Sequence, residues 1–148
     1  MNSLVENQRE VVARHIRGEN EHDWPAVYDT FVQDHRAHYD VMPLGASFKG
    51  IEGVRDFYQV IAAALPDLHI EVVSEYDAPG CSIRELVITG THRGEFAGVM
   101  PLGNPIRLEM AAFYGFDRDS GKLISERIYY DHATAVAQMT KGSHTSVA

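Results

Sequence analysis

The sequence has a single cysteine, Cys81, among its 148 residues. One cysteine permits neither an intrachain disulfide nor a cysteine-based zinc site, and it suits a reducing cytoplasm. Basic residues are also few: 13 lysines and arginines stand against 21 acidic residues, which gives a formal charge of −8. Because no Lys/Arg cluster offers a surface for phosphate groups, we expect neither a nucleic-acid partner nor an anionic-membrane partner.

Long apolar runs are missing as well. Nowhere do about 18 apolar residues run together, and the first residues lack the basic segment and apolar core of a secretion signal. We therefore expect a cytoplasmic protein. With 45% hydrophobic residues, a chain of this length can bury a core of its own. We predict one domain over residues 1–148, with residues 142–148 as a mobile tail.

The first part of the chain has a helical apolar period. Apolar residues at three-and-four spacing predict helices over residues 4–18 and 51–65, with a shorter helix capped by Asp23 between them. A short strand is predicted around residues 35–42, before the turn-forming Pro43.

From residue 68 onward the pattern is typical of strands separated by turns. Residues 83–91, 106–116 and 121–131 read as strands of one meander, and residues 132–141 as a last helix. Helices that precede a run of antiparallel strands indicate an α+β fold with the helices on one face of a curved sheet. Such a cone leaves a hollow that suits a small apolar ligand.

The closing strand carries carboxylates among apolar and aromatic residues. Glu126 shares one strand face with Ile128 and Tyr130, whereas Asp131 shares the other face with Arg127. Whichever face is covered, a charged group lies on it. Carboxylates in such surroundings are candidates for chemistry.

Three segments carry a resemblance to a known family. Residues 48–58 with 65–68 are similar to F-x-G-x-E-x-[VI]-R-x-F-Y … P-D-L, residues 90–103 to G-T-H-x-G-E-F-x-G-x-P-x-x-G, and residues 125–131 to S-E-R-x-Y-x-D. In this order the segments resemble the SnoaL-like branch of the nuclear transport factor 2-like superfamily. The resemblance implies a cone-like fold in which N-terminal helices wrap a curved mixed or antiparallel sheet. It further implies a homodimer and chemistry on a small hydrophobic molecule without cofactor. From the residues themselves we expect no metal site.

The resemblance leaves the reaction open, because one fold hosts many activities. Our leading hypothesis is an acid/base enzyme of the cyclase or isomerase type acting on a polyketide- or terpenoid-like molecule. The alternatives are an epoxide hydrolase or dehydratase, and a non-catalytic module for ligand binding or dimerisation.

Two candidate site residues lie on the predicted short strand. In superfamily members similar to ketosteroid isomerase a carboxylate near Asp40 abstracts a proton next to a carbonyl, which makes Asp40 a candidate general base. The alternative is an Asp that braces the turn at Pro43. His38 shares the strand face of Asp40 and either relays a proton or is a surface histidine. In the isomerases a neighbouring strand supplies the oxyanion donor, but here the corresponding position, near Phe113, is apolar. An isomerase mechanism would therefore need Tyr114 or His92 in that role.

The closing strand departs from the family pattern. Aligned on the Gly-Lys pair at 121–122, the catalytic acid of classical SnoaL-like cyclases falls near Ile128, and isoleucine cannot transfer a proton. Glu126 is the replacement that we expect, unless it pairs with a buried arginine such as Arg107. Asp131 either caps the last helix or reaches the pocket mouth.

The remaining predictions concern the pocket wall. His92 is either a second acid/base group or a brace for the loop at 95–103. The apolar run at 100–102 reads as a flap over the pocket. The residues that we expect around the ligand are Phe57, Met100, Tyr114, Ile128 and Tyr130.

Overall fold

The structure is a computed structural model that describes residues 3–143. Residues 144–148 of the predicted tail lie outside the described part. Its elements are α1 (Leu4–Asn20), α2 (Trp24–Asp29), β1 (His38–Val41), β2 (Ala46–Lys49), α3 (Gly50–Ala64), β3 (His69–Ala78), β4 (Cys81–Thr91), β5 (Pro105–Phe116), β6 (Leu123–Tyr130) and α4 (His132–Thr140).

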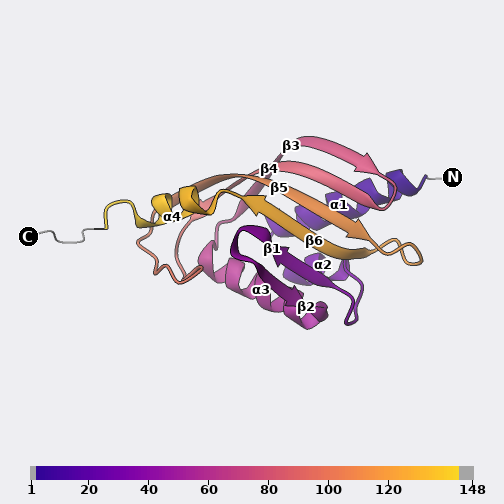
Figure 1. The fold of residues 1–148 in the computed structure, drawn as a ribbon, viewed down its shortest axis with the longest axis horizontal. Coiled ribbons are helices and arrows are strands. Elements are labelled where there is room, and N and C mark those ends of the chain that lie inside the picture. Colours follow the sequence, from indigo (N-terminus) through magenta and orange to yellow (C-terminus); the bar gives the residue numbers. More distant parts are fainter. Residues whose placement is uncertain (1–2, 144–148) are drawn as a thin grey trace, which may run out of the picture.

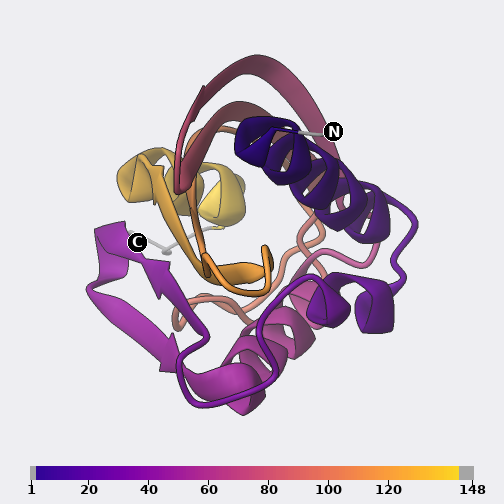
Figure 2. The ribbon, with the colours of Figure 1, turned by 90° about the vertical axis from the view of Figure 1, so that its right-hand side faces the viewer.

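The six strands form one curved sheet in the order β2-β1-β6-β5-β4-β3 (Figure 1). Neighbouring strands are antiparallel except β1 and β6, which run parallel. Viewed end-on, the helices and the sheet form a ring, with α1, α2 and α3 along one side of the concave sheet (Figure 2). The predicted α+β cone is therefore confirmed.

The sequence pattern missed the second strand of the β1–β2 hairpin. The two strands have four residues each, too few for a two-residue period to be recognised. A short 3-10 turn at Met42–Leu44 joins them, and Gly45 follows it with a φ of 61°. This left-handed conformation favours glycine. On β1, Tyr39 and Val41 are buried, so the hairpin adds its inner face to the core.

Helix α1 begins at a capping box. The Ser3 hydroxyl accepts a hydrogen bond from the Glu6 backbone, and the Glu6 carboxylate accepts one from the Ser3 backbone. The buried face of α1 combines apolar residues with Gln8, His15 and Glu19. Buried polar side chains need partners, and their partners lie on other elements.

A buried polar network fixes α1 to the β3–β4 hairpin. Asp77 accepts hydrogen bonds from Ser82 at 2.6 Å, from Arg84 at 3.1 Å and from Arg9 at 2.8 Å. Gln8 accepts one from the Gly80 backbone at 2.8 Å. Burial pushes the pKa of Asp77 upward, but the three hydrogen bonds outweigh burial and lower that pKa.

Helix α4 closes one end of the cone. The Asn104 side chain donates to the backbone carbonyls of Gln138, Met139 and Lys141, where the helix ends. Ala135 and Met139 pack on Ile106 of β5. Within residues 3–143, no helix is long and apolar enough to cross a membrane.

Candidate functional site

A cavity of about 90 Å³ lies between the helices and the concave face of the sheet. Its wall is built mainly by aliphatic and aromatic side chains from α3, α4 and five strands. Apart from tyrosines, the ionisable side chains that residues 3–143 place in this wall are Glu19, Glu126 and His92. All three are nearly inaccessible to solvent. The site is therefore an apolar chamber with a few buried polar groups, as is typical of small-molecule pockets.

Glu126 lies in a cluster that joins the first helix to the last strand. Its Oε1 atom is 2.9 Å from Nε2 of His15, and Oε1 of Glu19 is 3.4 Å from the same nitrogen. The Tyr58 hydroxyl lies 3.0 Å from Nε2 of His15 and 3.2 Å from an oxygen of each glutamate. We call these four residues the acid cluster.

Hydrogen bonds on the far side of the imidazole orient His15. The Thr30 hydroxyl donates to the Val27 carbonyl at 2.6 Å, so its own oxygen is free to accept. Nδ1 of His15 is 2.9 Å from this oxygen and therefore carries a proton that it donates to Thr30. As a result, Nε2 faces the two glutamates.

Burial and charge control the protonation of the acid cluster. Burial raises the pKa of Glu19 to about 8; the charge of His15 acts against this rise and the charge of Glu126 adds to it. Burial alone would lower the pKa of His15, but the charges of Glu19 and Glu126 outweigh burial and raise it. Burial raises the pKa of Tyr58 well above its usual range, so its hydroxyl keeps its proton.

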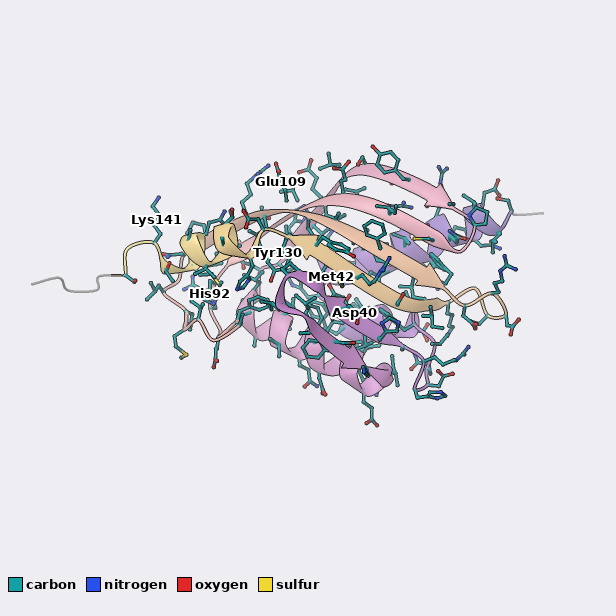
Figure 3. All side chains as sticks on the ribbon, in the orientation of Figure 1. Asp40, Met42, His92, Glu109, Tyr130 and Lys141 are labelled. Atoms are coloured by element: carbon teal, nitrogen blue, oxygen red, sulfur yellow. The ribbon has the colours of Figure 1, made fainter. Side chains whose placement is uncertain are left out.

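His92 is the other ionisable group in the wall. It follows β4, and its backbone pairs with Asn104 and Gly103 across the base of the intervening loop. The loop packs on the end of α3: a side chain at Gly94 would meet the Ala63 carbonyl oxygen at 2.5 Å. Both ring nitrogens of His92 are buried and have no hydrogen-bond partner among the described residues. In Figure 3 His92 lies near α4, at the end of the cone that this helix closes.

Not all sequence-predicted site residues are in the cavity wall. Glu126, His92, Phe57, Ile128 and Tyr130 are part of it. Glu126 pairs with a histidine and not with an arginine.

Asp40 and His38 lie outside the cavity. On β1 the buried residues are Tyr39 and Val41, so the two candidates point to the other face of the sheet. There Asp40 accepts hydrogen bonds from Ser47 at 2.7 Å and from His38 at 3.0 Å. This arrangement gives Asp40 no access to a ligand in the cone.

Three further residues also lie away from the cavity. Tyr114 is fully buried, but it packs behind His15 with ring centroids 5.6 Å apart and is not in the wall. Met100 is 66% exposed and does not cover the cavity, so the predicted flap is not found. Asp131 caps α4 and accepts hydrogen bonds from Ala133 and Thr134.

Sequence reasoning missed His15 and Glu19. They lie four residues apart on α1, which places them on one helix face. Val12 and Ile16 of the same helix are buried as well. The sequence did contain a signal for this buried polar site: two ionisable residues occur at the spacing of the helix's apolar stripe.

Fold and cavity define a cone-shaped α+β protein whose apolar chamber contains ionisable groups from distant parts of the chain. The sequence matches the model of the SnoaL-like polyketide cyclase family over residues 9–139, and the chain belongs to this family. No curated protein matches the sequence.

Solved structures share this fold. A protein of Jannaschia sp. CCS1 assigned to the SnoaL-like polyketide cyclases has a TM-score of 0.83 at 18% identity, covering 95% of this chain and 96% of that one. IdmH from Streptomyces antibioticus, assigned as a polyketide cyclase, has a TM-score of 0.72 at 22% identity (88% and 96% covered). SalBIII, an epoxide hydrolase/cyclase-like enzyme in pyran ring formation of the polyether salinomycin, has a TM-score of 0.72 at 17% identity (86% and 92% covered).

Proposed function

We propose that this protein is an acid/base enzyme of the cyclase or isomerase type that acts on a small hydrophobic molecule of polyketide- or terpenoid-like character. The observation that carries the proposal is the acid cluster, because it places two buried carboxyl groups in the wall of an otherwise apolar chamber. Membership of the SnoaL-like family supports a cyclase-type role.

The chain's own side chains supply the acid and the base in this proposal. Glu126 lies on the closing strand two residues before Ile128, where the family pattern puts its acid, and it acts together with Glu19. One carboxyl group donates a proton to the oxygen where negative charge develops during ring closure. His92, whose ring nitrogens are both unpaired within residues 3–143, is the second acid/base group. No cofactor is proposed.

The size of the chamber sets a condition on the substrate. A volume of about 90 Å³ is smaller than the roughly 150 Å³ cavity that takes up benzene in another protein. A polyketide-sized molecule therefore enters only when the cone widens. We expect the cone to widen at the end near His92, since α4 and the loop after β4 close this end.

The test uses two model substrates that close a six-membered ring. The protein is incubated with a hydroxy-enone and with a hydroxy-epoxide in ¹⁸O-labelled water, and the products are identified by mass spectrometry. We expect the wild type to form the ring without incorporating label. We expect Glu126→Gln and His92→Phe to lose this ring closure. A labelled diol from the epoxide would instead assign the protein as a hydrolase.

A second candidate is a non-catalytic binding module. The small cavity volume and Ile128 at the family's acid position favour it. Native mass spectrometry followed by denaturing extraction identifies any molecule that travels with the protein. A retained compound that the protein leaves chemically unchanged, with no ring closure on either model substrate, would decide for this candidate.

We also propose a homodimer through the outer face of the sheet. There Phe113 packs edge-on against Tyr129 at 5.5 Å, and the Arg127 guanidinium lies 5.3 Å from the Phe113 ring centroid. Aromatic and arginine side chains are enriched at such interfaces. Light scattering at micromolar concentration tests this: a dimer is expected for the wild type and a monomer for Tyr129→Glu.

A further inference from the structure

We propose that the two carboxyl groups of the acid cluster have different roles. Glu19 keeps a proton and donates it to an oxygen of the ligand, whereas Glu126 remains an anion held by His15. The chamber therefore selects neutral molecules that carry a carbonyl or ether oxygen, and it rejects organic cations. This inference rests on the proposed function in that it concerns the same cavity.

The geometry around His15 distinguishes the two carboxyl groups. Nδ1 donates to Thr30, so only Nε2 is free to meet a carboxylate. Nε2 is 2.9 Å from Glu126 and 3.4 Å from Glu19. Charge-assisted hydrogen bonds are short, so the proton on Nε2 points to Glu126. Glu126 is then the partner that stays ionised.

A count of charges leaves one proton for Glu19. The ionisable groups that face Glu19 are His15 on its own helix, Tyr58 on α3, Tyr39 on β1, Tyr114 on β5 and Glu126 on β6. Within residues 3–143, no lysine or arginine is in the wall. One imidazolium balances one carboxylate, and a second buried anion without a counter-charge is costly. A proton on Glu19 makes the cluster neutral, and the raised pKa of Glu19 agrees with this.

A neutral carboxylic acid in an apolar wall is a hydrogen-bond donor. It pairs with a carbonyl, ether or epoxide oxygen, which can only accept. Such a pair also places an acidic proton on the oxygen that becomes negative when a carbon nucleophile attacks or an epoxide opens. In contrast, an organic cation would require Glu19 to ionise.

A metal ion is the competing way to neutralise the cluster. One ligand atom each of His15, Glu19 and Glu126 lies within 4.8 Å of the others, and a divalent cation would balance both carboxylates. This competitor predicts the opposite protonation, with Nε2 of His15 and both glutamates free of protons. The experiment below therefore distinguishes a bound metal ion from a protonated Glu19.

The experiment compares three compact probes: cyclopentanone, cyclopentane and tetramethylammonium. None of them titrates, so a pH dependence of affinity reports the protein. Affinities are measured by ligand-observed NMR from pH 6 to 9.5 with the wild type and with Glu19→Gln. The Gln side chain keeps a donor but cannot ionise, so it is the matched control.

We expect the wild type to bind cyclopentanone best at pH 6–7 and to lose roughly two- to tenfold of this affinity above pH 8, as for one hydrogen bond. Cyclopentane binding should not change over this range, and Glu19→Gln should bind the ketone with no pH dependence. If Glu19→Gln does not fold, the ¹³C carboxyl shift of Glu19 in the wild type replaces it, with a protonated carboxyl expected at pH 7.

Three outcomes would overturn the inference. Tetramethylammonium that binds more tightly than cyclopentanone at pH 7 would show an ionised pair. Ketone affinity that is independent of pH in the wild type would remove Glu19 as the donor. One divalent metal ion per chain in the purified protein, measured by mass spectrometry, would assign the neutralisation to a metal. Ring closure that persists alongside any of these would leave the proposed function intact and this inference wrong.

Discussion

Oε1 of Glu126 lies 2.9 Å from Nε2 of His15, and this contact joins the last strand of the sheet to the first helix. Both side chains are almost completely buried. The pair is thus part of the core, and Glu126 is also part of the cavity wall. A change at either residue affects stability as well as chemistry, and the two effects need separate measurements.

Glu126→Gln should lower the free energy of unfolding by about 1.5–3 kcal/mol, the usual worth of a hydrogen bond to a charged group. The full cost of an unpaired buried charge is not expected, because Glu19 lies 3.4 Å from the same nitrogen and can ionise in place of Glu126. Urea unfolding at pH 6.5 measures the change. Glu109→Gln is the matched control, since the Glu109 side chain is 84% exposed, and it should cost under about 0.5 kcal/mol. Equal stability of both variants would contradict the buried pair.

Stability should fall as the pH rises from about 4.3 to about 8. Glu19 loses its proton near pH 4.3 in the unfolded chain but only near pH 8 in the folded protein. Between these values the folded state binds one proton more, so the free energy of unfolding falls by about 1.4 kcal/mol per pH unit. Above pH 6.5 the raised pKa of His15 also makes the free energy of unfolding fall as the pH rises. Glu19→Gln should remove the Glu19 part of this slope, as urea unfolding at pH 5, 6.5 and 8 will show. Parallel slopes for variant and wild type would mean that Glu19 is ionised in the fold.

His92→Phe should leave stability unchanged or raise it by about 1 kcal/mol, while ligand binding or turnover is impaired. The reason is that the two buried nitrogens of His92 have no partner in the part of the chain that the structure describes, and an unsatisfied buried polar group costs about 1–3 kcal/mol. Phenylalanine has similar bulk and no polar atom. Thermal unfolding and the ring-closure assay together check this. Destabilisation by more than 1 kcal/mol would show that His92 braces the loop after β4.

Much of the fold was predictable because it depends on local patterns. The helical and strand periods and the family motifs predicted the helices, the long strands and the cone. The β1–β2 hairpin was not predictable in this way, because its strands are short and its position depends on pairing with β6. Pairing between distant segments leaves little trace in a local period.

The candidate site was less predictable than the fold. Glu126 was found because a carboxylate on an otherwise apolar strand face is unusual. The same reasoning overlooked His15 and Glu19, since α1 was read for its apolar stripe alone. Asp40 was named by analogy, and strand alternation could not decide which face of β1 is covered until the neighbours of Tyr39 were known.

Arg84→Met should destabilise the protein by about 3 kcal/mol. Breaking a buried ion pair by removal of one partner typically costs 3–5 kcal/mol, and Arg9 and Ser82 remain to bind Asp77. Arg107→Met, on an exposed side chain, is the control. Because hydrogen bonds lower the pKa of Asp77, its contribution is present above about pH 3.9 and is lost as the pH falls through the lower folded value. Acid unfolding should therefore begin at higher pH in Arg84→Met than in the wild type.

Asp40→Asn should leave ring closure unchanged within about twofold, whereas loss of an acid/base group such as Glu126 costs roughly 10²- to 10⁴-fold. Asp40 lies on the sheet face opposite the buried Tyr39 and Val41, where it binds Ser47 and His38. It therefore cannot reach a molecule inside the cone. Its partners are partly exposed, so the substitution should cost under about 1 kcal/mol of stability. The two variants are compared for turnover on the same model substrate and at the same pH. If Asp40→Asn were as inactive as Glu126→Gln, the chemistry would take place outside the chamber, and the acid cluster would be only a structural part of the core.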